Sequence, residues 1–480
     1  MSPRLLKNTI ILSASQVISR LLSFTFSLLV ARYLGVEQFG MFTYSLSLIA
    51  LFSTVVDFGL STLTVREMIQ DRSKLNLYFF HAIILRYILA GLLYSILYFY
   101  SASLPNSEQI KQNLLLIMGL YLFVRALFDS SVSFFQSQER QDIGGYLQIL
   151  NNFSLLIIGL IYVMLQKDVL YFATAHVVAG LIASIVGLTL ISFKISFDFR
   201  LSFNFIMNLF KKTVPFGFTF FVSSAYARMD ILMLSWLRTD LEVGEYGASL
   251  RIIDGLLLIP IVGNRILYPY LSRISSDSQN FQFIVEKSIK ILVIASFYIL
   301  AIGIISADWL ILTLFPVSFK NSAHILQVLI FTLIAAYPNY ILGSALFSLH
   351  RQNMALKVVS VALIVNIISN LFFIPLWGTV GAAVTAIISG ILILTGYIWA
   401  LRDKINSLKV IKLIGSVFLI SSSLILPVFY LTDQYPLYFY IIVFSVMYPL
   451  TLYALGLIKY HEIEYMILKF NEAFKRSKTF

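Results

Sequence analysis

The chain has 480 residues, of which 59% are hydrophobic and only 12% are charged, and its formal net charge is +12. Repeated continuous apolar runs of about 20 residues, the length that a membrane-spanning helix needs, exclude a soluble globular protein and the short alternating strands of a spanning β-barrel. The absence of cysteine excludes disulfides and thiolate metal sites.

These runs predict an all-α integral membrane protein with about 14 transmembrane helices. The first run carries Arg20 at its middle and lacks a small-residue cleavage site, so we interpret it as a retained helix and not a signal peptide. The expected helices cover residues 8–31, 41–62, 79–101, 113–135, 146–166, 169–193, 213–237, 248–272, 289–313, 324–348, 356–376, 378–401, 411–432 and 436–458.

The basic residues are distributed unevenly between the two sides of this predicted topology. With the N-terminus inside, most of the 35 Lys and Arg residues fall on the cytoplasmic side. This is the positive-inside distribution, and it predicts that both termini are cytoplasmic. The net charge of +12 is therefore a topology signal and calls for no nucleic-acid partner.

Three short patterns recur about 210 residues further along the chain, each at the same position of a six-helix unit: 37–40 (EQFG) with 244–247 (GEYG), 140–141 (RQ) with 351–352 (RQ), and 175–180 (AHVVAG) with 386–390 (AIISG). The alternative is coincidence among apolar helices of similar composition. If the patterns are homologous, the two halves are parallel repeats related by an axis along the membrane normal.

The repeat predicts how the chain is divided. We expect a six-helix N-terminal lobe (1–193), an amphipathic cytoplasmic linker rich in Phe and basic residues (194–212), a six-helix C-terminal lobe (213–401), helices 13 and 14 (402–458) and a basic amphipathic cytoplasmic tail (459–480). The outward loops are too short to build an extracellular domain, so the function is expected to lie within the membrane.

Charged residues inside the spans are expensive, and they indicate a protein interior or a wet cavity. They lie in the first two to four helices of each predicted lobe, which favours a cavity between the lobes. Arginine suits a phosphate ligand because its planar fork forms bidentate hydrogen bonds. The candidate substrate-binding residues are Arg20, Arg125, Arg228, Arg265, Arg86 and Arg251, and the candidate gating or ion-coupling residues are Asp57, Asp129, Asp230 and Asp254.

Structural interpretations stand beside these functional ones. Arg125 and Asp129, at i,i+4, can neutralise each other, as can Arg251 and Asp254 at i,i+3. Arg86 can extend to the membrane surface, and Asp57 can pair with Arg66. His176 is expected to be a packing or hydrogen-bonding residue.

Motifs of enzymes are absent from the sequence. It contains no GK[ST] phosphate loop, HExxH, GxSxG or DxD pattern, which argues against an ATP-driven pump and most hydrolases. We therefore expect no enzymatic activity, no cofactor and no resident metal.

The sequence around Arg20, in residues 31–48 (ARYLGVEQFGMFTYSLSL), in residues 55–68 (VVDFGLSTLTVREM) and in residues 227–254 resembles the polysaccharide-transport (Wzx-type) flippases of the multidrug/oligosaccharidyl-lipid/polysaccharide (MOP) exporter superfamily. The resemblance implies a multi-pass protein of the bacterial cytoplasmic membrane that flips an undecaprenyl-pyrophosphate-linked oligosaccharide by alternating access. It also implies a central cationic cavity, which assigns a substrate role to Arg20, Arg125 and Arg228.

Partners follow from the same resemblance: membrane lipids, a polysaccharide polymerase with chain-length machinery, and a proton or sodium ion as the coupling ion. A lipid II flippase or a multidrug/cation antiporter of the same superfamily is the alternative. A membrane polysaccharide polymerase or acyltransferase fits less well, because such enzymes generally carry sizeable outward loops.

Overall fold

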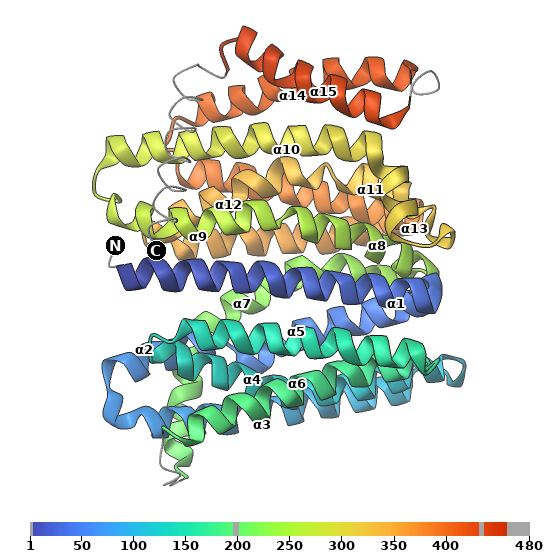
Figure 1. Cartoon of the computed structure of the whole chain (residues 1–480). Coiled ribbons are helices and arrows are strands. Elements are labelled where there is room, and N and C mark those ends of the chain that lie inside the picture. Colours follow the sequence, from blue (N-terminus) through green and yellow to red (C-terminus); the bar gives the residue numbers. More distant parts are fainter. Residues whose placement is uncertain (1–2, 195–200, 432–435, 458–480) are drawn as a thin grey trace.

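The computed structural model describes residues 3–194, 201–431 and 436–457, and these residues form helices without any β-strand. Figure 1 shows two packed groups of helices, α1 to α6 below and α8 to α13 above, with α14 and α15 at the upper edge. We call the helices up to α6 the first half and those from α7 to α13 the second half. The α-helices are α1 (Pro3–Asp57), α2 (Leu60–Gln70), α3 (Leu75–Ser103), α4 (Gln109–Ser137), α5 (Gln141–Met164), α6 (Val169–Ser192), α7 (Phe203–Leu237), α8 (Asp240–Leu256), α9 (Leu258–Arg273), α10 (Ser278–Leu314), α11 (Ser322–Leu329), α12 (Thr332–Ser348), α13 (Gln352–Ala400), α14 (Ser407–Leu431) and α15 (Leu437–Ala454), with short 3₁₀ turns at Arg72–Lys74, Asn106–Glu108 and Val317–Phe319.

The apolar length of these helices makes the chain a multi-pass membrane protein. Within the described ranges, nine helical segments are long and apolar enough to cross a membrane, or ten if the pair α11 and α12, bent by 44°, counts as one. The expected number was higher for three reasons. The helices α1 and α13 each contain two expected spans, and α8 and α9, with 17 and 16 residues, divide another span between them. The helix α7, which contains the expected span 213–237, is not among the nine segments.

Two glycines break the long helices. Gly35 in α1 has φ 79° and ψ 179°, and Gly378 in α13 has φ 56° and ψ −130°. Both conformations belong to the region of positive φ that L side chains avoid, so glycine is needed where the chain turns back. The first turn is tighter than expected, because the helix runs to Gly35 and resumes directly, where residues 32–40 were expected to form a loop.

The helix α7 begins at Phe203, inside the range expected for the linker. Its first turns pack on the first half: the Phe205 ring lies 5.1 Å from the Tyr78 ring, and Lys212 forms an ion pair of 3.6 Å with Glu67. The expected linker residues 195–200 and the expected tail 459–480 lie outside the described residues.

The two halves touch closely at both ends of the bundle. At one end, where α1 begins, Gly217 of α7 lies against the Phe58 ring. We call this the Pro3 end and the opposite end, where α1 turns back, the Gly35 end (Figure 1). At the Gly35 end the contact is between α1 and α8. A β-carbon added at Gly40 would collide with the backbone of Asp240, and one added at Gly244 would collide with the carbonyl of Val36. Glycine therefore lets the backbones of α1 and α8 meet, and the two copies of the repeated pattern contact each other.

Polar contacts join the halves at the same end. The Arg32 guanidinium donates from Nε to the carbonyl of Leu314 at 2.8 Å and from Nη2 to that of Thr313 at 2.6 Å, at the C-terminus of α10. Lys111 in α4 donates to the Asp240 carboxylate at 3.0 Å and lies over the Tyr44 ring. The Gly35 end is therefore closed by backbone packing, hydrogen bonds and an ion pair.

Candidate functional site

A cavity of about 900 Å³ lies within the first half, between the middle of the bundle and the Pro3 end. Polar residues reach it from α1, α2, α4 and α5 at helical spacing, so that each helix contributes a polar stripe within a largely apolar sequence. From the second half, only Phe220, Ser224 and Arg265 among the described residues line this cavity. The polar wall of this cavity is therefore supplied mainly by the first half.

Arg20 and Arg265 meet in this cavity. Arg20 lies on the middle of the first segment of α1, yet its side chain is exposed. Arg265, on α9, is close enough for the two positive charges to repel one another, and its Nη1 is buried without a hydrogen-bond partner among the described residues. Two like charges facing one space, with a donor left unused, form a site suited to an anion.

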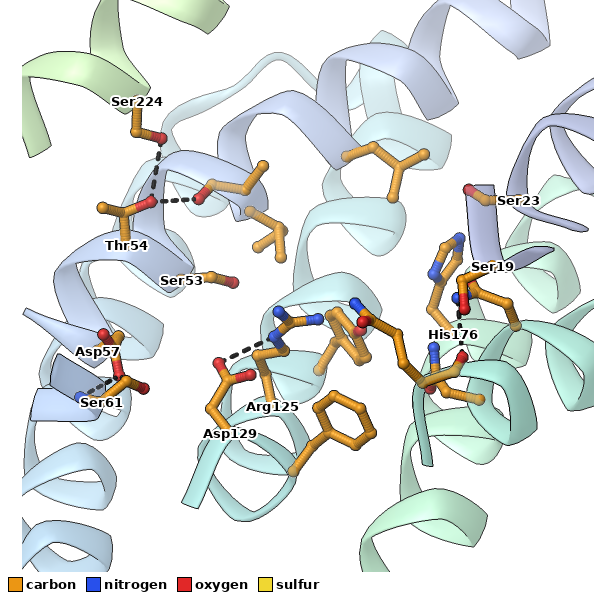
Figure 2. A pocket seen from close by; sticks show the side chains of 18 of the residues that line it. Ser19, Ser23, Ser53, Thr54, Asp57, Ser61, Arg125, Asp129, His176 and Ser224 are labelled. Atoms are coloured by element: carbon orange, nitrogen blue, oxygen red, sulfur yellow. Dashed lines mark hydrogen bonds and ion pairs between the residues drawn. The ribbon is translucent and has the colours of Figure 1, made fainter. Parts of the chain in front are cut away.

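Arg125 and Asp129 form a pair on α4, with the Arg125 Nε donating to the Asp129 carboxylate at 2.9 Å. Figure 2 shows this pair between Asp57 with Ser61 on one side and Ser19 with His176 on the other. The Arg125 side chain is 35% exposed, so it is paired but still accessible from the cavity.

Arg86 occupies a different environment from the other candidate arginines. Its side chain is 1% exposed and it lies behind the cavity wall, where Nη2 donates to Asp57 at 2.7 Å and to Ser61 at 2.9 Å. Its Nη1 donates to Ser130 at 2.6 Å. Asp57 thus pairs with Arg86, whereas Arg66 pairs with Glu67, and Asp57 also lines the cavity.

A second cavity, of about 930 Å³, lies between α1 and the second half, and Arg20 and Ser23 line both cavities. Arg228 and Arg251 reach it from α7 and α8 and are close enough to repel one another. Asp254 lines the same cavity and attracts Arg251. Both residues are described, and their charged atoms are more than 4.0 Å apart. Most of the other residues that line this cavity are apolar, from α1, α8, α9, α10, α11 and α15.

Asp230 points away from both cavities, into the second half. Its carboxylate accepts hydrogen bonds of 2.9 Å from the Nδ2 groups of Asn366 and Asn370 on α13, and one of 3.4 Å from the hydroxyl of Tyr246. No ion pair to Asp230 is present within the described ranges. The side-chain oxygens of Asn370 and Thr385, both on α13, are buried without a hydrogen-bond partner among the described residues.

Sequence reasoning missed the uncharged polar part of the first cavity. Gln148, Asn151 and Asn152 on α5 and Gln16 on α1 line it. The signal was the spacing i, i+3, i+4 on α5 within an apolar run, which places the three amides on one face. His176 also lines the cavity, and its ring lies against the rings of Phe26, Phe42 and Tyr121.

The comparisons with known proteins agree on one class. A sequence profile of the family described as polysaccharide biosynthesis protein matches residues 5–275. The probable low-salt glycan biosynthesis flippase Agl15 of Haloferax volcanii is 23% identical over 368 residues, which are 75% of each chain.

Solved structures show the same fold. The structure of a lipid II flippase MurJ in an inward closed conformation has a TM-score of 0.77 at 15% identity, covering 93% of this chain and 99% of that chain. An inward-facing MATE multidrug resistance transporter of the MOP superfamily has a TM-score of 0.66 at 13% identity, covering 80% of this chain and 94% of that chain.

The similar proteins are flippases and transporters and not enzymes. The family match covers more than half of the sequence. The helical bundle around two arginine-lined cavities agrees with it. The chain belongs to the polysaccharide biosynthesis protein family, as a multi-pass membrane protein with the fold of the MurJ and MATE transporters.

Proposed function

We propose that the protein flips an undecaprenyl-pyrophosphate-linked oligosaccharide across the bacterial cytoplasmic membrane by alternating access. The observation that carries the proposal is the arrangement of Arg20 with Arg265 and of Arg228 with Arg251. Each pair of like charges lines one of two cavities that meet at Arg20. Such an arrangement is costly in a membrane unless an anion binds between the arginines.

A diphosphate fits this arrangement chemically. Guanidinium groups remain charged when water is removed and donate two parallel hydrogen bonds to phosphate oxygens. The largely apolar lining of the second cavity allows a prenyl chain to lie beside the arginines, and the polar first cavity has room for sugars. The proposed substrate-binding residues are Arg20, Arg125, Arg228, Arg251 and Arg265, with Arg86 acting through Asp57.

The proposed topology has fourteen spans with both termini in the cytoplasm. It counts α1 and α13 as two spans each, the pairs α8 with α9 and α11 with α12 as one each, and α2 as the end of the second span. The Pro3 end is then cytoplasmic and the Gly35 end is outside. In this view, residues 1–193 and 213–401 form the two lobes, and the packing of Gly40 on α8 closes the outer end.

Asp230 is the proposed ion-coupling carboxylate. It is held by two amides and a hydroxyl with no basic partner described, so its charge is left uncompensated in the second half. An uncompensated buried carboxylate binds a proton or a cation at a large gain in free energy. The proposed ion is therefore a proton or sodium. Asp57 and Asp129, which pair with arginines, are proposed to act as gating residues, together with Asp254 in the second cavity.

The arginine surplus favours an anionic lipid over the cationic substrates of a multidrug antiporter. It does not distinguish an oligosaccharide lipid from lipid II, because both carry a diphosphate on a prenyl chain. The undecaprenyl carrier, the bacterial membrane and the polymerase partner stay predictions, since the curated relative is archaeal.

The test is surface polysaccharide display in a bacterial strain that lacks its own flippase, complemented with wild-type protein or with Arg20→Ala or Arg20→Lys. Wild type is expected to restore display, Arg20→Ala to lower it at least about tenfold, since a charged hydrogen bond contributes about 1.5–3 kcal/mol, and Arg20→Lys to retain part. A strain depleted of its lipid II flippase, complemented in parallel, separates the two lipid substrates.

The matched control is Arg140→Ala, because Arg140 pairs with Asp142 at the start of α5 and neither residue lines either cavity. All variants are compared at equal abundance in the membrane. Full display with Arg20→Ala, or transport of a cationic dye by the purified wild-type protein, would contradict the anion-binding cavity.

A further inference from the structure

The amide side chains of the first cavity form a surface that the arginines do not explain. We call Gln16, Gln148, Asn151 and Asn152 the amide wall. Three of its members occupy one face of α5, while the opposite face carries Phe153, which is 52% exposed on the outside of the bundle. Amides within a spanning helix are unfavourable in lipid, so they need a polar partner or a wet space.

The helices α1 and α5 do not need the amide wall in order to pack. They are in close contact at Gly145, where an added β-carbon would lie 2.7 Å from the Ser15 hydroxyl, and at Gly159, where one would lie 2.7 Å from the Phe26 ring. The amides of α5 lie between these two contacts, where the helices border the cavity. Packing therefore leaves their chemistry unexplained.

The hydrogen-bonding capacity of the wall is largely unused. Gln16, Gln148 and Asn151 make no side-chain hydrogen bond to another described residue, and Asn152 uses only its Nδ2, which donates to the carbonyl of Gln148 at 2.9 Å. The hydroxyl of Ser19, on the same face of α1 as Gln16, is also buried without a described partner. A row of free donors and acceptors on a cavity wall is a binding surface for a neutral polar ligand.

Sugar hydroxyls match this surface better than phosphate does. An amide both donates and accepts a hydrogen bond, as a hydroxyl does, whereas a diphosphate only accepts and is better served by arginine. Tyr121, which is partly exposed, lines the same cavity and adds an aromatic ring to the amide wall. The second cavity carries Arg228 and Arg251 but none of these amides.

We infer that the amide wall binds the sugar part of the lipid-linked substrate, while Arg228 and Arg251 bind its diphosphate. This inference rests on the proposed function, and it divides recognition between the two cavities with Arg20 at their junction. Glycan specificity then resides in α1 and α5 of the first half.

The experiment measures binding by the purified full-length protein in lipid nanodiscs. The probes are undecaprenyl pyrophosphate, undecaprenyl-pyrophosphate-linked N-acetylglucosamine and its galactose-extended disaccharide. The variant Gln148→Met/Asn151→Leu keeps the approximate length and branching of the side chains but removes the amides. One of the two sugar-bearing probes will bind wild type more tightly than the other. We expect the variant to bind that probe about tenfold more weakly, because two hydrogen bonds are lost. Its affinity for undecaprenyl pyrophosphate should stay unchanged.

Two further variants make the result specific. Arg228→Ala is expected to weaken all three probes by the same factor, and Tyr146→Phe, which removes a hydroxyl from the exposed face of α5, is expected to weaken none. Thermal unfolding verifies that each variant is folded.

The outcomes separate the two proposals. Equal weakening of the bare and sugar-bearing probes by Gln148→Met/Asn151→Leu, or no weakening at all, overturns the amide wall while leaving the flippase proposal intact. The same holds if wild type binds undecaprenyl pyrophosphate as tightly as both sugar-bearing probes. If wild type binds none of the three, the proposed function fails, and the amide wall with it.

Discussion

At the scale of single residues, Arg20 and Arg86 show how burial and partners distinguish two arginines of the same half. Arg20 is exposed to two cavities, and no ion pair to it is present among the described residues. Arg86 is 1% exposed and uses all its donor nitrogens on Asp57, Ser61 and Ser130. The first arginine is available to a ligand, and the second is a structural partner that holds Asp57 at the cavity wall.

This difference predicts opposite responses to truncation. Arg86→Ala removes the partner of a carboxylate that is only 22% exposed, and we expect it to lower the free energy of unfolding by about 3 kcal/mol. The midpoint of thermal unfolding in detergent should fall accordingly, while Arg20→Ala should leave it unchanged. The double variant Arg86→Met/Asp57→Asn should recover much of the stability. An unchanged midpoint for Arg86→Ala would show that the pair does not stabilise the fold.

The sequence made the charged residues easier to predict than the amides. Arg20 and the pair Arg125 and Asp129 stand out because a charge within an apolar run is rare. Gln148 and Asn151 carry no charge, so the α5 segment resembles an ordinary span. The partner of Asp57 could not be predicted either, because Arg86 is 29 residues away and only the fold brings them together.

At the scale of helices, the cluster around Asp230 links α7, α8 and α13 through one carboxylate. Binding of an ion there changes the charge that the two asparagines of α13 and Tyr246 of α8 surround. The helices that carry Arg228 and Arg251 are the same α7 and α8. A change at Asp230 can therefore reach the second cavity through two short helical segments.

Asp230→Asn removes the negative charge but keeps the size of the side chain. In proteoliposomes with an imposed sodium or proton gradient, we expect this variant to bind undecaprenyl pyrophosphate as wild type does but to lose the stimulation of flipping by the gradient. The gradient that stimulates wild type identifies the ion. Asp403→Asn is the control, since Asp403 pairs with Arg351 at the surface. Full stimulation of the Asp230→Asn variant would exclude Asp230 as the coupling group.

The boundaries of helices were only partly predictable. Apolar length placed most segments, and the expected boundary between the eleventh and twelfth spans, at residue 377, lies next to the break at Gly378. The first turn was predicted as a loop of residues 32–40, because polar residues there resemble a connection. A single glycine at positive φ is sufficient to reverse the chain, and hydropathy does not report that conformation.

At the scale of the whole molecule, the contact between α1 and α8 fixes how the two halves lie at the Gly35 end. A β-carbon at position 247 would lie 3.5 Å from the β-carbon of Thr43. This spacing suits a disulfide, whose β-carbons lie about 3.5–4.5 Å apart. Because the chain contains no cysteine, an introduced pair has no competing thiol.

The variant Thr43→Cys/Gly247→Cys is therefore expected to cross-link under mild oxidation and to lock this end closed. If transport requires the halves to separate there, the disulfide raises the barrier to that separation. An increase of more than about 1.4 kcal/mol lowers the rate of flipping at least about tenfold. The rate should return after reduction. The single variants should be insensitive to both treatments. Unchanged flipping by the cross-linked protein would contradict alternating access through the Gly35 end.

The contact between Arg32 and α10 has a consequence for the substitutions that the closed end tolerates. Its acceptors are the backbone carbonyls of Thr313 and Leu314, which every residue type provides. Lys111 instead depends on the side-chain carboxylate of Asp240. The sequence of α10 can therefore change at positions 313 and 314 without loss of the first contact, whereas position 240 must keep an acidic residue for the second.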